Sequence, residues 1–127
     1  MKTPGIIEAA YNDSQGVTAA FNLNMLRHLN RRFDGDFDLG RFQHRAFFNA
    51  AAAQIEMHLA SADAQTVRLR KLGMSARFEP GETISTEISR KFRFADMAAA
   101  VEGHGFALAE RWSDDSEWFA LALFRRV

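Results

Sequence analysis

The spacing of apolar residues changes within the first 91 residues from a helical period near 3.6 to a strand period of 2. One apolar stripe at four-residue spacing predicts a helix over residues 16–33, and it consists of Val17, Phe21, Met25 and Leu29. Asp13 or Ser14 can cap the start of this helix, and the turn signal at residues 34–36 predicts its end. A helix therefore precedes the strand-forming part of the chain.

Polar and apolar residues alternate from about residue 44 to residue 91, as they do along strands with one buried face. Ile55, Met57 and Leu59 share one face of such a strand. Glu56 and His58 share the opposite face. Turn signals between the alternating segments predict four or five antiparallel strands joined by short hairpins. The alanines at 50–53 are compatible with either a loop or an extension of helix.

The last third of the chain carries a second helical segment followed by two apolar-rich strands. Residues 94–102 predict a helix that ends at residues 103–105, where His104 between two glycines fits a capping role. Residues 106–112 and 118–124 predict strands on either side of a hairpin turn. The predicted fold is α+β: an N-terminal helix packs on an antiparallel sheet, and a helix and a β-hairpin follow.

Composition excludes several classes of protein. The 127 residues contain no cysteine, so neither a disulfide framework nor a cysteine-based zinc site can form. Sixteen basic and sixteen acidic residues balance, without the basic excess typical of nucleic-acid binding. No apolar run suits a signal peptide or a membrane span. We therefore expect a soluble cytoplasmic protein with neither nucleic acid nor membrane as a partner.

The familiar catalytic, metal and nucleotide motifs do not occur in the sequence. The four histidines have no metal-ligand spacing, and no serine nucleophile elbow or glycine-rich phosphate loop is present. Asp34, Asp36 and Asp38 alternate like the start of a calcium loop, but Leu39 and Arg45 stand where that loop needs glycine and glutamate. We therefore predict no catalytic, metal-binding or cofactor-binding residue in this chain.

A ladder of polar residues occupies a predicted strand at residues 81–89. Alternation puts Ile84, Thr86 and Ile88 on one face, and Glu87 and Ser89 on the other with Ser85. The carboxylate and the hydroxyl lie roughly 6.6 Å apart along the strand, which suits gripping a small polar ring from two directions. Taken alone, an ordinary solvent-exposed strand face explains this pair better than a binding site does.

Three further segments accompany this ladder in a specific order. Residues 10–13 (AYND) precede residues 16–22 (GVTAAFN), and residues 55–57 (IEM) precede the ladder and its continuation to residue 92 (GETISTEISRKF). Over residues 10–124 the chain resembles the C-terminal part of the histidine-specific methyltransferase family. That S-adenosylmethionine-dependent group includes the histidine Nα-methyltransferase of ergothioneine biosynthesis.

The resemblance implies a substrate-binding role for four residues. Tyr11 would hydrogen-bond the carboxylate of an amino-acid substrate, and Met57 would pack against its ring. Glu87 and Ser89 would hold the two imidazole nitrogens, because a carboxylate accepts one N–H while a hydroxyl donates to or accepts from the other nitrogen. A relative acting on an indole should lack this polar pair, since a buried carboxylate would have no partner there. Histidine is therefore the expected substrate.

The resemblance also implies a division of labour along the chain. Residues 1–91 would form the substrate-recognition portion, and residues 92–127 would be the last helix and β-hairpin of a Rossmann-like methyltransferase sheet. The family's long N-terminal part, which carries the S-adenosylmethionine site, has no counterpart here. S-adenosylmethionine would thus serve the complete enzyme without a binding site in this chain, and we expect the chain alone to be inactive.

The apolar strands at 106–112 and 118–124 would lack the parallel sheet that they join in the family. We therefore expect a homo-oligomer, a swapped arrangement or a separate chain that carries the donor domain. Two alternatives remain open. The chain would then be a non-enzymatic amino-acid-binding module, or a remnant that acts through a partner chain.

Overall fold

The computed structural model describes residues 3–127, which form two compact units. The first unit comprises residues 4–89, and the second comprises residues 90–127 together with Thr3. Both units combine helices with antiparallel strands, so the α+β class predicted from the sequence is confirmed.

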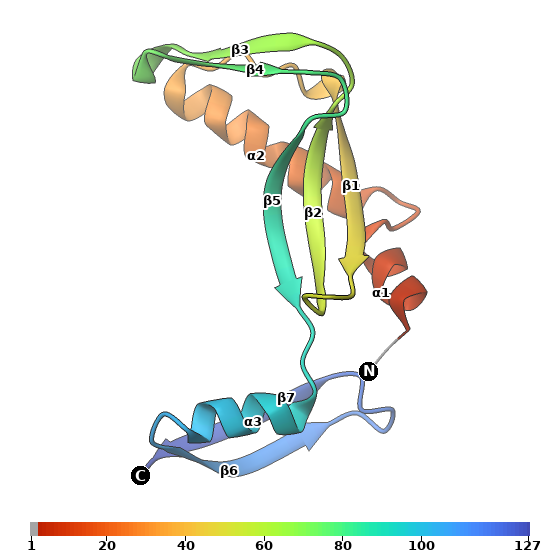
Figure 1. Cartoon of the computed structure of the whole chain (residues 1–127), viewed down its shortest axis with the longest axis vertical. Helices are drawn as coiled ribbons and strands as arrows, with labels where there is room; N and C mark the ends of the chain where they lie inside the picture. Colours follow the sequence, from red (N-terminus) through yellow and green to blue (C-terminus); the bar gives the residue numbers. More distant parts are fainter. Residues whose placement is uncertain (1–2) are drawn as a thin grey trace. The chain divides into compact units, whose positions relative to one another are not determined.

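The first unit contains two helices and five strands. In chain order its elements are α1 (Pro4–Tyr11), α2 (Val17–Phe33), a 3-10 turn (Leu39–Arg41), β1 (Phe42–Asn49), β2 (Gln54–Ser61), β3 (Gln65–Leu69), a 3-10 turn (Arg70–Leu72), β4 (Met74–Phe78) and β5 (Thr83–Arg90). The strands form two sheets, one in the order β1-β2-β5 and the other pairing β3 with β4. Figure 1 shows α2 across one face of the three-stranded sheet. The sequence predicted four or five antiparallel strands, and the structure has five, with residues 50–53 in the turn between β1 and β2.

The buried face of β2 is the one that its alternation predicts. Ile55 and Leu59 are completely buried, and Met57 is 3% exposed. Leu59 joins Leu26 of α2 in the larger hydrophobic core, while Ile55 and Met57 pack with Ile7 of α1 in a smaller cluster. Burial of these side chains supplies the driving force that holds both helices on the sheet.

Three phenylalanines join the two sheets of the first unit. Phe42 of β1 meets Phe78 of β4 edge-on, with ring centroids 5.4 Å apart. Phe37, from the segment that follows α2, meets Phe42 edge-on at 5.7 Å. Such edge-to-face contacts are favoured by the ring quadrupoles. The β3–β4 hairpin is thereby fixed to the end of the three-stranded sheet.

Helix α2 has the predicted length, and the later part of its predicted stripe, Met25 and Leu29, packs partly buried against the larger core. Val17 and Phe21, from the start of the same stripe, are 64% and 67% exposed. The buried positions on this helix are Asn22 and Leu26. The amide of Asn22 is accommodated because it hydrogen-bonds the His44 ring and a backbone carbonyl, so its burial leaves no donor unsatisfied. The N-cap is Gly16 and neither of the two predicted residues, but the Asp13 carboxylate accepts hydrogen bonds from the N–H groups of the first turn.

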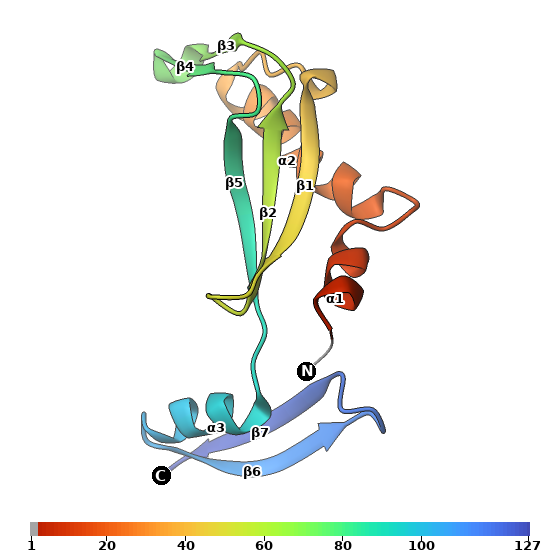
Figure 2. The ribbon, with the colours of Figure 1, turned by 45° about the vertical axis from the view of Figure 1, so that its right-hand side comes forward.

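Helix α1 was not predicted from the sequence, and it covers the outer edge of β1. The Glu8 carboxylate accepts the backbone N–H of Phe48 at 2.8 Å, and the Asn12 side chain donates to the carbonyl of Ala46 at 2.9 Å. Figure 2 shows α1 beside β1. These side chains satisfy backbone groups that an open edge strand would leave exposed for pairing with another chain.

The second unit consists of α3 (Phe94–Glu102), β6 (Phe106–Ser113) and β7 (Ala120–Arg126). The helix has its predicted bounds, and the His104 ring contacts the carbonyl of Ala100 at 2.8 Å in the expected capping role. Strand β7 begins two residues later than predicted, because the Asp114 carboxylate accepts the N–H groups of Ser116 and Phe119 and thereby extends the loop. No helix within residues 3–127 is long and apolar enough to cross a membrane.

Candidate functional site

Tyr11 and Ser89 come together from opposite ends of the first unit's sequence. Tyr11 is the last residue of α1, and Ser89 lies near the end of β5. The Tyr11 hydroxyl donates a hydrogen bond to Ser89 Oγ at 2.8 Å. The Tyr11 ring also packs against the cluster of Ile7, Ile55 and Met57, so its position is set by apolar contacts as well as by this bond.

Met57 lies beneath the neighbouring stretch of β5. Its side chain is buried, and its backbone carbonyl accepts a hydrogen bond from Thr86 Oγ1 at 2.9 Å. This bond ties β5 to β2 beside Glu87, in addition to the ladder between the two strands. The thioether is polarisable and suits contact with an aromatic ring.

Met57 and Glu87 both line a cavity of about 310 Å³. Its walls come from α2, β2 and β5, and consist of Phe21, Asn22, Asn24, Met25, His28, Met57, Thr86 and Glu87. The volume is at the lower end of the range for small-molecule sites, about 300–1,000 Å³. The lining combines an apolar wall with one carboxylate and several hydrogen-bonding groups, which is a suitable surface for a small polar ring.

The four residues predicted as a site are thus arranged as two pairs around Met57. Tyr11 contacts Ser89, and Met57 shares the cavity with Glu87. Tyr11 belongs to the apolar cluster that contains Met57, so the two pairs adjoin one another. Neither Tyr11 nor Ser89 is among the residues that line the cavity itself.

The burial pattern along β5 alternates only over its first half. Ile84 packs against the larger core and Thr86 is half-buried, as predicted for one face. Ile88, assigned to the same face, is 58% exposed. Ser89 is half-buried beside Tyr11, whereas Glu87 is exposed at the cavity. At this end of the edge strand, Glu87 therefore lies at the cavity while Ser89 lies against Tyr11.

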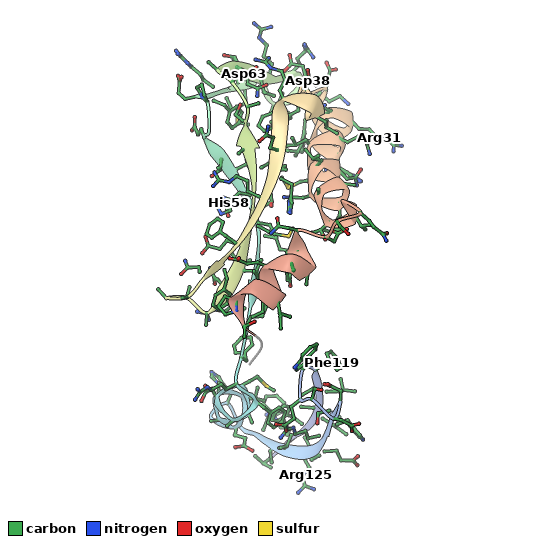
Figure 3. The ribbon with its side chains drawn as sticks, turned by 90° about the vertical axis from the view of Figure 1, so that its right-hand side faces the viewer. Arg31, Asp38, His58, Asp63, Phe119 and Arg125 are labelled. Atoms are coloured by element: carbon green, nitrogen blue, oxygen red, sulfur yellow. The ribbon has the colours of Figure 1, made fainter. Side chains whose placement is uncertain are left out.

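A second polar group lies on the sheet face away from α2, where Figure 3 shows His58. The Glu56 carboxylate accepts hydrogen bonds from Gln54 and Asn49, which lower the pKa of Glu56 below its usual range. The His58 ring stacks on Phe47 with centroids 5.3 Å apart. Within residues 3–127 no three acidic, histidine or cysteine side chains gather in a way that could hold a metal ion.

Comparison with known proteins decides the family. A family model described as "Histidine-specific methyltransferase, SAM-dependent" matches residues 1–126. The chain belongs to this histidine-specific methyltransferase family. It is 40% identical over 123 residues to the histidine N-alpha-methyltransferase of Mycolicibacterium smegmatis (strain ATCC 700084 / mc(2)155), an alignment that covers 97% of this chain and 38% of the relative. It is also 40% identical over 114 residues to the histidine N-alpha-methyltransferase of Mycobacterium tuberculosis (strain CDC 1551 / Oshkosh), covering 90% of this chain and 36% of the relative.

The chain therefore spans well under half the length of these two methyltransferases. S-adenosylmethionine-dependent enzymes need a site for the donor's nucleoside and its charged sulfur. In this chain, α2 follows a loop after α1, and α3 follows residues 91–93 with Arg93 at its N-cap. Neither helix opens from a strand through a glycine-rich turn, so the residues described here do not fit the donor group by that route.

Sequence reasoning missed the contribution of α2 to the cavity. Phe21, Met25 and His28 lie on one helical face because they are four and three residues apart. The four-residue spacing of Phe21 and Met25 was interpreted only as the apolar stripe of a helix. Phe21 is exposed, as a residue in a cavity wall is, whereas a residue in a buried stripe would not be.

Proposed function

We propose that this chain is the substrate-recognition portion of a histidine Nα-methyltransferase. The observation that carries the proposal is a cavity lined by Met57 and Glu87. It adjoins the Tyr11–Ser89 pair and occurs in a member of the histidine-specific family. The complete enzyme would methylate the α-amine of histidine stepwise to a trimethylated betaine. This is the reaction that ergothioneine biosynthesis requires.

The proposed pose uses each polar group in a role that its chemistry allows. The imidazole ring lies against Met57, and one ring N–H donates to the Glu87 carboxylate. The Ser89 hydroxyl donates to or accepts from the other ring nitrogen, and the Tyr11 hydroxyl donates to the substrate carboxylate. The Tyr11 hydroxyl donates to Ser89 Oγ, so the two hydroxyls that the pose uses lie side by side.

S-adenosylmethionine would supply the methyl group. Methyl transfer requires the donor and the substrate amine to be held in line at close approach, and positioning supplies most of the acceleration. The residues of this chain would bind the imidazole and the carboxylate, which fixes where the α-amine lies. The donor site would be provided by the part of the relatives that this chain does not match.

A titration of the ¹⁵N-labelled chain with L-histidine tests the proposal. We expect the amide signals of Tyr11, Met57, Glu87 and Ser89 to shift with millimolar affinity, because half of the complete site is present. Glu87→Gln should weaken binding by about tenfold, since hydrogen bonds to a charged acceptor contribute more than neutral ones. Glu110→Gln, at an exposed position of the second unit, is the matched control.

Two outcomes would contradict the proposal. Absence of any shift at tens of millimolar histidine would remove the binding role. Equal shifts with L-tryptophan would remove the specificity, because an indole offers no second ring nitrogen for Ser89. We also expect no methylated product when the chain is incubated with histidine and S-adenosylmethionine, and turnover would show that a donor site had been overlooked.

A non-enzymatic amino-acid-binding module is the second candidate. The observation that favours it is that Tyr11, Met57, Glu87, Ser89 and the whole cavity lie within one compact unit, residues 4–89. Such a unit can bind an amino acid without a donor domain. Micromolar affinity of the isolated chain for histidine would support this candidate over half of an enzyme site.

A further inference from the structure

His44 joins the end of α1 to α2 through both nitrogens of its ring. The residue lies half-buried on the inner face of β1. Its Nε2 is 2.8 Å from the backbone carbonyl oxygen of Tyr11, and its Nδ1 is 2.9 Å from the Nδ2 atom of Asn22. The three residues come from β1, α1 and α2, so one side chain connects three elements.

A third contact fixes which atoms donate in this network. Asn22 Nδ2 also donates to the backbone carbonyl of His58 at 3.2 Å. A carbonyl only accepts, so the amide nitrogen of Asn22 must point toward it, and both of its hydrogens are then committed. His44 Nδ1 is consequently an acceptor, and the single ring proton sits on Nε2, where it donates to the Tyr11 carbonyl. Asn22 is 3% exposed, so its amide is shielded from solvent.

The consequence falls on Tyr11. Its carbonyl belongs to the last turn of α1, where carbonyls have no partner within the helix. The bond from His44 supplies that partner and holds the backbone of Tyr11 against β1. The hydroxyl of the same residue reaches Ser89 at its other end. Fixing the backbone therefore limits where the hydroxyl can lie.

We infer that His44, in its Nε2-protonated neutral form, is the positioning residue for the Tyr11 hydroxyl. Its effect on substrate affinity rests on the proposed function, in which that hydroxyl binds the substrate carboxylate. Its effect on the position of Tyr11 is independent of that function. His44 touches no substrate atom in this scheme and acts only through Tyr11.

Three substitutions separate the two bonds of the ring. His44→Gln places an amide N–H near the position of Nε2 and can still donate to Tyr11. His44→Asn places an oxygen near the position of Nδ1 and keeps only the bond from Asn22. His44→Phe keeps neither bond. His104→Phe in the second unit is the control, because that ring contacts only the carbonyl of Ala100 in its own helix end.

Tyr11 is the only tyrosine of the chain, so ¹³C-tyrosine labelling gives one set of ring signals that reports its environment directly. We expect the ring signals of His44→Asn and His44→Phe to shift or broaden, while those of His44→Gln and His104→Phe match the unmodified chain. Long-range ¹H–¹⁵N spectra should show proton attachment at Nε2 of His44 alone. Far-UV circular dichroism identifies any variant that fails to fold, and the Asn and Gln variants still discriminate if His44→Phe does.

Histidine titration adds the second readout. His44→Asn should weaken histidine binding by about tenfold and His44→Gln should restore it, because a displaced contact group loses binding energy. Ring signals of Tyr11 that are identical in all three variants, or a proton on Nδ1 of His44, would overturn the inference. If no form of the chain binds histidine yet the tyrosine signals respond as expected, the proposed function fails and the positioning role stands.

Discussion

Both oxygens of the Asp13 carboxylate accept hydrogen bonds at the start of α2. Thr18 N–H donates to Oδ1 and Val17 N–H donates to Oδ2, each at 2.8 Å. The bond from Thr18, and then that from Val17, lower the pKa of Asp13 from its ordinary value of 3.8 to about 2. Because the folded-state pKa is the lower one, the ionised carboxylate stabilises the fold above pH 3.8, and this contribution is lost as the pH falls toward 2.

Asp13→Ala should therefore lower the melting temperature by a few degrees at neutral pH, because two N–H groups of the first turn lose their acceptor. The difference from the unmodified chain should shrink between pH 3.8 and pH 2. Thermal melts followed by circular dichroism at several pH values measure it. Ser14→Ala, at the other predicted cap, is the control and should have little effect. An Asp13→Ala deficit that stays constant to pH 2 would contradict this assignment.

Asn22 shows the limit of prediction at the scale of single residues. Periodicity placed Val17 and Phe21 in the apolar stripe of α2, yet both are exposed and Asn22 beside them is buried. Its burial depends on His44 and on the His58 carbonyl, which lie 22 and 36 residues away in the sequence. The apolar period of a helix contains no information about such distant partners. The family resemblance predicted Tyr11, Met57, Glu87 and Ser89 as site residues. The contribution of α2 to the cavity wall could be found only in the three-dimensional structure.

Secondary structure elements were more predictable than their partners. The helical spacing located α2 and α3, and the strand period located β2 and β5 within a strand-forming region that also holds β1, β3 and β4. The period of a strand fixes its faces but not the strand beside it. β2 and β5 are neighbours although the β3–β4 hairpin separates them in sequence, and α1 is too short for a recognisable stripe.

The junction between α2 and β3 tolerates no side chain at Gly35. A Cβ atom there would lie 2.7 Å from Asn30 Oδ1 and 2.8 Å from Leu69 Cδ2. Asn30 cannot move away freely, because its amide accepts the Phe37 N–H and donates to the Phe37 carbonyl. The backbone of Gly35 also forms an isolated antiparallel β-bridge with Leu69.

Gly35→Ala should consequently lower the free energy of unfolding by about 1–3 kcal/mol, the usual cost of overpacking a filled site. Urea denaturation followed by fluorescence or circular dichroism gives this value. Gly5→Ala in α1 is the matched control, since no atom lies within 4 Å of its added Cβ and alanine favours a helix. Unchanged stability of Gly35→Ala would mean that Asn30 and Leu69 can relax.

At the scale of the whole molecule, the hairpin of the second unit exposes an apolar face. On one face of the hairpin Leu108 and Phe124 pair across β6 and β7 and are half-buried. On the other face Trp112 and Leu121 pair, and they are 47% and 57% exposed. Leu123 shares the face of Leu121 because the two are two residues apart on one strand. An exposed apolar face of this kind marks an interaction surface.

We propose that the donor-binding part of the family's longer relatives covers this face in the complete enzyme. Without that part, the same face should pair between copies, and the chain should self-associate as its concentration rises. Light scattering coupled to size-exclusion chromatography measures the mass. The double substitution Leu121→Asp and Leu123→Asp should yield a monomer, because a charge cannot be buried there without a partner. Leu72→Asp, at an exposed leucine of the first unit, should not change the association. The proposal would be contradicted if the chain stays monomeric at every concentration. It would also be contradicted if Leu72→Asp reduces the association as much as the double substitution does.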